Sequence, residues 1–92
     1  MATELEASRR LTQWAAWRNG QGLDNTVEAS MAKLHASETA WRVCEQASRV
    51  LASYGYARDY AVERYLRDAR FTLIGGGTSE ILKINIGKGL QR

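Results

Sequence analysis

The chain has 92 residues, a length that suits one small domain. Its 13 basic and 10 acidic side chains give a net charge of +3, which is too weak to indicate nucleic-acid binding. No apolar run approaches the roughly 18 residues that a membrane-spanning helix needs, and the N-terminus lacks the pattern of a signal peptide. One cysteine excludes an internal disulfide and one histidine leaves little material for a metal site, so we expect a cytoplasmic protein without a membrane span, a bound metal or nucleic acid.

Two long helices are predicted in the first half of the chain. The first covers about residues 2–18, where apolar side chains recur at intervals of three and four, and Gly20 follows its end. The second is predicted at about residues 26–53, with Asn25 as its cap and Glu28 completing a capping box. The second helix has two apolar stripes, which predict neighbours on two sides and a central position in the fold.

Two shorter helices complete the pattern. Gly55 is predicted to stop the long helix, and a helix at about residues 61–70 follows. Residues 71–77 are predicted to form a loop, after which the hydroxyls of Thr78 and Ser79 are suited to cap a last helix at about residues 79–90. The connections are short, so the sequence predicts an all-α fold with neighbouring helices antiparallel.

Several residues that can carry chemistry have simpler interpretations. Cys44 lies on an apolar side with no base near it in sequence, which favours a small buried core residue over a nucleophile. His35 has no second metal ligand at helical spacing, which favours a surface or capping role. Three tryptophans at helical spacing are predicted in the core: Trp14, Trp17 and Trp41.

The segment from residue 58 to residue 70 contains four arginines, which could suggest a surface for nucleic acid. Acidic residues alternate with them, so opposite charges stand three or four positions apart on a helix. The segment therefore predicts local ion pairs, and not a continuous positive stripe.

The strongest local signal is Gly75-Gly76-Gly77 followed by Thr78-Ser79-Glu80 at a predicted helix start. Glycines let the backbone approach a ligand closely, and a helix N-terminus offers N–H groups to a phosphate or a carbonyl oxygen. No lysine follows at the spacing of a Walker motif, and no strand precedes the glycines as in a dinucleotide fingerprint. The residues alone leave two interpretations open, a simple connection and a ligand site.

The second half of the chain resembles the C-terminal signature of acyl-CoA dehydrogenases. That signature has a Gly-Tyr turn, Tyr-Pro-(Val/Ile)-Glu-(Arg/Lys), Arg-Asp-Ala and Glu-Gly-Thr-Ser-Glu, and its spacing matches here. The matching residues are Tyr54-Gly55-Tyr56-Ala57-Arg58-Asp59-Tyr60-Ala61-Val62-Glu63-Arg64-Tyr65-Leu66-Arg67-Asp68-Ala69-Arg70, Ile74 and Gly77-Thr78-Ser79-Glu80-Ile81. Residues 1–52 look like the two long helices before that signature, so the resemblance covers essentially the whole chain.

The resemblance implies part of an antiparallel four-helix bundle that lies over a flavin and forms an oligomer interface. It implies α,β-dehydrogenation of an acyl-CoA thioester with FAD as cofactor, in a homo-oligomer. The family's Gly-Thr-Ser-Glu stretch contacts FAD, so Thr78, Ser79 and Glu80 are implied to bind the cofactor. Gly77 is implied to lie beside the acyl-CoA.

The chain departs from the family pattern in three places, one of which is a segment of several residues. Gly76 stands where the family has its catalytic carboxylate, so no catalytic residue is assigned here. The isovaleryl and long-chain branches also have a small residue there and take the carboxylate from an earlier helix. The family's Gln-x-x-Gly-Gly-x-Gly flavin segment is Arg-Val-Leu-Ala-Ser-Tyr-Gly at residues 49–55, and Ala61 replaces a proline.

The family also has an N-terminal helical domain and a middle β-domain, and we expect both to be absent from these 92 residues. The chain is then expected to be inactive alone and to self-associate through its uncovered apolar face. Two functions stay open. One is the C-terminal domain of an acyl-CoA dehydrogenase, and the alternative is a non-catalytic helical oligomerisation or interaction module derived from that family.

Overall fold

The structure, a computed structural model, describes residues 1–91 and confirms the all-α prediction over that range. The helices are α1 (Ala2–Gly20), α2 (Thr26–Leu51), α3 (Ser53–Tyr56), α4 (Ala61–Thr72) and α5 (Ser79–Leu90). The last helix has the predicted bounds, α1 and α4 end slightly later than predicted, and α2 ends slightly earlier. Among the described residues, none of the helices combines the length and apolar character needed to cross a bilayer.

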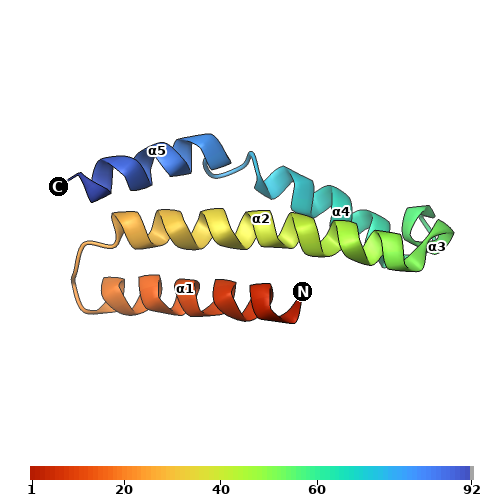
Figure 1. Ribbon diagram of the computed structural model, residues 1–92, viewed down its shortest axis with the longest axis horizontal. Helices are drawn as coiled ribbons and strands as arrows, with labels where there is room; N and C mark the ends of the chain where they lie inside the picture. Colours follow the sequence, from red (N-terminus) through yellow and green to blue (C-terminus); the bar gives the residue numbers. More distant parts are fainter. Residues whose placement is uncertain (92) are drawn as a thin grey trace.

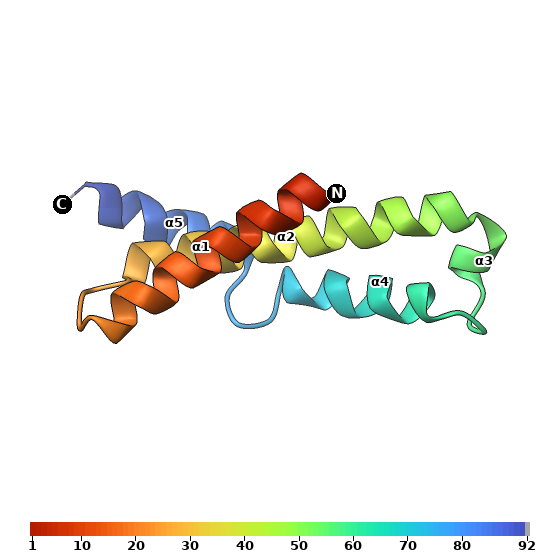
Figure 2. The same cartoon turned by 90° about the horizontal axis from the view of Figure 1, so that it is seen from below.

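The long helix α2 is the centre of the fold. α1 packs along one side of it and α5 along the opposite side, while α4 packs on a third side, and all three run antiparallel to α2 (Figure 1 and Figure 2). α5 lies by the N-terminal half of α2 and α4 by its C-terminal half (Figure 2). Within residues 1–91, α1 and α5 pack on no helix other than α2. This is part of an antiparallel helical bundle, and the two apolar stripes correctly predicted the central position of α2.

The start of α2 is capped differently from the prediction. The backbone N–H and the hydroxyl of Thr26 both donate to Oδ1 of Asp24, at 3.0 and 2.7 Å. Asn25 instead donates through Nδ2 to a backbone carbonyl of α1 at 3.1 Å, and Glu28 forms an ion pair with Arg18 at 3.1 Å. The predicted capping box is wrong because both of its side chains hold α1 against α2.

Gly55 does not end α2 as predicted. The helix ends at Leu51, and Ala52, with a φ of 53°, turns the chain into α3. Gly55 lies inside α3 and is buried against α2, where an added Cβ would lie 2.8 Å from the Cα of Ser48 and closer still to its carbonyl oxygen. The role of Gly55 is therefore close packing of α3 on α2.

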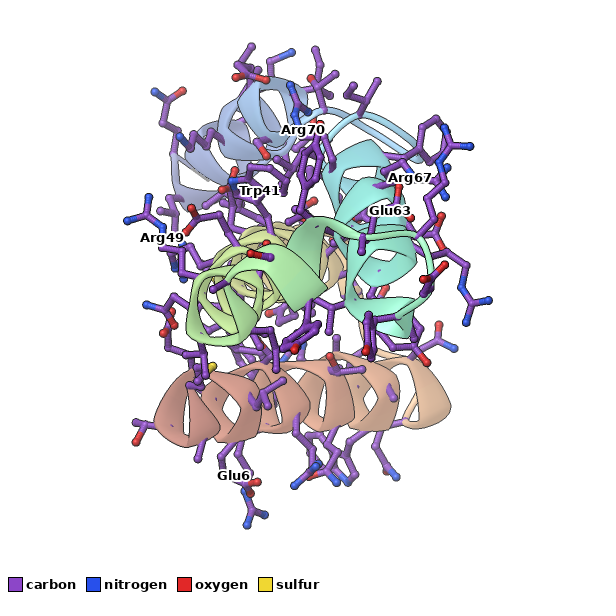
Figure 3. All side chains as sticks on the ribbon, turned by 90° about the vertical axis from the view of Figure 1, so that its right-hand side faces the viewer. Glu6, Trp41, Arg49, Glu63, Arg67 and Arg70 are labelled. Carbon is purple, nitrogen blue, oxygen red and sulfur yellow. The ribbon has the colours of Figure 1, made fainter. Side chains whose placement is uncertain are left out.

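The core is built mainly from small side chains. The buried residues that carry a side chain are Ser8, Ala15, Ser30, Ala32, Ser37, Thr39, Ala69, Ser79 and Leu82. Trp14 and Trp17 are 43% and 58% exposed, so their predicted place in the core is wrong. Trp41 is half-buried, and it faces the guanidinium of Arg70, whose central carbon lies 6.0 Å from the ring centroid (Figure 3).

An ion pair joins the start of α1 to α2 and makes their contact depend on pH. Arg42 donates through Nε to Oε2 of Glu4 at 2.8 Å, and this hydrogen bond holds the pKa of the Glu4 carboxyl below its usual value of 4.5. A carboxyl whose pKa is lower in the folded chain stabilises the fold above its ordinary pKa. That stabilisation is lost as the pH falls through the lowered pKa of Glu4.

We expect Glu4→Gln to weaken the dependence of the free energy of unfolding on pH below 4.5, measured by urea unfolding at a series of pH values. Glu6→Gln is the matched control, because Glu6 points away from the bundle (Figure 3) and pairs with arginines of α1 itself. A Glu4→Gln chain with the pH slope of the parent would contradict the assignment.

Candidate site at the start of helix α5

The glycine-rich loop between α4 and α5 has a backbone that side chains disfavour. Gly76 and Gly77 have φ values of 74° and 110°. A Cβ at Gly76 would have nothing closer than Cε of Lys33, at 4.0 Å, so the space at this position is open. The left-handed φ values explain the need for glycine, and the open space lets another molecule approach the backbone.

The predicted cofactor residues lie together at the start of α5, but they point in different directions. Thr78 caps the helix, since its Oγ1 accepts a hydrogen bond from the N–H of Ile81 at 3.2 Å, as predicted. Ser79 is only 5% exposed, and its hydroxyl donates to Oε1 of Glu38 on α2 at 2.7 Å. Glu80 is exposed in the first turn of the helix. Thr78 and Glu80 are thus accessible, whereas the Ser79 hydroxyl is used inside the fold.

Three consecutive backbone N–H groups are available on this turn. The N–H groups of Gly76, Gly77 and Thr78 donate to no group within residues 1–91. Adjacent N–H groups in a turn with left-handed residues form a concave donor surface for anions and carbonyl oxygens, and the positive end of a helix adds to it. The turn therefore offers hydrogen-bond donors to a polar ligand, which fits a phosphate or thioester oxygen.

Lys33 belongs to this site, although nothing in its local sequence indicates this. Its ammonium donates to the carbonyl oxygens of Thr72, at 2.5 Å, and Gly77, at 2.8 Å. These contacts join residues that are 39 and 44 positions apart in the chain. No local spacing could have revealed them.

Other residues considered in the sequence have structural surroundings. His35 Nδ1 lies 2.7 Å from the hydroxyl oxygen of Ser8, so His35 joins α1 to α2 instead of lying at the surface or at a cap. Cys44 is half-buried, and burial raises the pKa of its thiol, which disfavours the reactive thiolate. No group of three or more potential metal ligands occurs within residues 1–91.

One of the arginines after α3, Arg67, forms the local ion pair that its spacing predicted. Arg67 donates through Nε to Oε1 of Glu63 at 2.6 Å on the outer side of α4 (Figure 3). Arg64 lies over the ring of Tyr65 at 5.3 Å from its centroid, and Arg70 faces α2. This part of α4 therefore presents mixed charges and aromatic contacts.

Comparisons with known proteins agree with this geometry. Residues 1–91 match the family model described as acyl-CoA dehydrogenase, C-terminal domain. The chain is 61% identical over 88 residues to benzylmalonyl-CoA dehydrogenase of Aromatoleum aromaticum, a match that covers 96% of this chain and 23% of that protein. It is 45% identical over 92 residues to the mitochondrial short-chain specific acyl-CoA dehydrogenase of Rattus norvegicus, covering 100% of this chain and 22% of that protein.

The solved structures give the same result. Butyryl-CoA dehydrogenase from Megasphaera elsdenii superposes with a TM-score of 0.97 at 39% identity, over 100% of this chain and 24% of that one. The fold and these matches define a helical dehydrogenase domain. The chain belongs to the acyl-CoA dehydrogenase family, in which it corresponds to the C-terminal domain. It spans about a quarter of the length of the relatives it matches.

Proposed function

We propose that the chain acts as the C-terminal domain of a flavin-dependent acyl-CoA dehydrogenase and contributes contacts to FAD. The observation that carries the proposal is the turn with three available N–H groups before α5, beside the Thr78 cap. The chemistry that FAD supplies when bound is acceptance of a hydride from the acyl chain. Gly76 carries no carboxylate, so the chain alone has no base at that position and is inactive by itself.

The site residues differ in how they support this proposal. Thr78 has an accessible hydroxyl that accepts from the helix and can still donate its proton to a flavin oxygen or nitrogen. Glu80 is exposed on the same turn, and the N–H of Gly77 is available to an oxygen of an acyl-CoA thioester. Ser79 has a structural role in the site, because its hydroxyl donates to Glu38 and fixes the start of α5 on α2.

The test is a titration of FAD with the purified chain, followed by flavin fluorescence. We expect saturable binding by the parent chain at about micromolar concentrations, and about tenfold weaker binding by Thr78→Ala. Thr78→Ala also removes a helix cap worth about 1 kcal/mol, so Thr78→Ser, which keeps the hydroxyl and the cap, is the matched control. Thr78→Ser should bind FAD like the parent.

The alternative, a non-catalytic helical module for homo-oligomerisation, is favoured by a different observation. Large apolar side chains remain exposed over the surface, among them Leu5, Trp17, Val50, Phe71, Ile74 and Leu90. Exposed apolar surface of this extent favours association, and we propose a cytoplasmic homo-oligomer under either function. Absence of FAD binding at millimolar chain, together with an oligomer in analytical ultracentrifugation, would favour the module over the flavin domain.

A further inference from the structure

One side chain of α2 connects both ends of the turn that carries the candidate site. Lys33 is half-buried, and its ammonium donates to Thr72 O, at the last residue of α4, and to Gly77 O, just before the α5 cap. A cation at the C-terminal end of α4 is also favoured by the negative end of the helix dipole. The Lys33 ammonium therefore holds the two ends of this turn together on the side that faces α2.

The bond to Gly77 has a geometric consequence for Thr78. The carbonyl of Gly77 and the N–H of Thr78 belong to one planar trans peptide, in which C=O and N–H point in opposite directions. Because Lys33 draws the carbonyl oxygen toward α2, the N–H of Thr78 is directed away from α2. This N–H is one of the three that find no acceptor within residues 1–91.

A second contact from α2 fixes the next residue along the chain. Glu38 accepts the hydroxyl proton of Ser79 at 2.7 Å, and the N–H of Ser79 donates to Leu73 O at 3.3 Å. Gly77 and Ser79 are thus both held by α2, one on each side of Thr78. Left-handed glycines would otherwise leave this peptide free to rotate, since glycine populates many backbone conformations.

We propose that Lys33 is a positioning residue for the candidate cofactor site, and that its ammonium orients the Gly77–Thr78 peptide so that the N–H of Thr78 faces the ligand. The inference rests on the proposed function for the identity of the ligand, FAD. The orientation of the peptide, however, is a property of the chain itself and is measurable without any ligand.

The experiment compares ¹⁵N–¹H spectra and FAD titrations of the chain and its Lys33→Met variant, in which the side chain keeps its approximate length without a donor. We expect the amide resonances of Gly77 and Thr78 to move or broaden while those of α1 stay in place. The FAD dissociation constant should rise about tenfold, the size expected when one hydrogen bond to a charged group is lost. Lys33→Arg, which keeps the donors, should restore both.

Lys83→Met is the matched control, because Lys83 is exposed on α5 and its ammonium makes no hydrogen bond within residues 1–91. If Lys33→Met does not fold, as judged by circular dichroism, Lys33→Leu gives the same comparison, because leucine also lacks a donor. Unchanged Thr78 resonances in a folded variant that lacks the Lys33 donor would overturn the proposal. If the parent chain binds no FAD but the Thr78 resonance moves, the positioning role stands and the flavin assignment fails.

Discussion

Gly55→Ala is expected to lower the free energy of unfolding by about 3 kcal/mol, the upper end of the usual cost of overpacking a core. The added Cβ would meet the backbone of Ser48, with its Cα at 2.8 Å and its carbonyl carbon at 3.0 Å. Backbone atoms of a central helix cannot move aside as a flexible side chain can. α3 would have to shift from α2, and urea unfolding followed by circular dichroism would measure the loss.

Gly87→Ala is the matched control for this substitution. Gly87 also lies in a helix, but nothing lies within 4 Å of the position that a Cβ would take. Alanine there should raise the free energy of unfolding by about 0.5–1 kcal/mol through higher helix propensity. Equal effects of the two substitutions would show that α3 does not pack as closely as described.

The second large effect is expected at Gly77. Its φ of 110° is a conformation that only glycine adopts readily, so Gly77→Ala should cost about 1–3 kcal/mol of stability. Space is not the obstacle, because the nearest atom to an added Cβ is Cδ2 of Leu82 at an ordinary 3.5 Å. Relief of the strain would rotate the peptide that Lys33 holds, so FAD binding should fall by tenfold or more.

A neighbouring substitution separates strain from simple bulk. Gly76 has a φ of 74°, which asparagine tolerates, and its Cβ position is open. Gly76→Asn should therefore cost less stability than Gly77→Ala in urea unfolding and should weaken FAD binding less in the fluorescence titration. If both variants bind FAD equally, the conformation of Gly77 does not shape the site.

The sequence predicted the helices well where local chemistry decides their ends. The bounds of α5 are correct because a hydroxyl at Thr78 and a following apolar pattern define the start of a helix without help from the rest of the fold. The start of α2 was placed correctly, but with the wrong cap. Asp24 and Asn25 both offer a suitable oxygen, and only the packing of α1 determines that Asn25 is used elsewhere.

Features that depend on contacts between distant segments were not predictable. Trp14 and Trp17 share a periodic pattern with buried residues, yet periodicity cannot show that no helix of the described chain covers them. Thr78 was identified as a candidate site residue, whereas Lys33 was not. The partners of Lys33 lie 39 and 44 positions away, so only the folded chain brings them together.

The central position of α2 also determines how this domain can open. α1 packs on α2 alone, and no contact within residues 1–91 couples α1 to α4 or α5. Local unfolding of α1 would therefore cost only the α1–α2 interface and would leave the turn before α5 attached to Lys33 and Glu38. Amide hydrogen exchange in α1 and at the site would then report two independent opening events. Within residues 1–91, α2 is the helix that links these two regions.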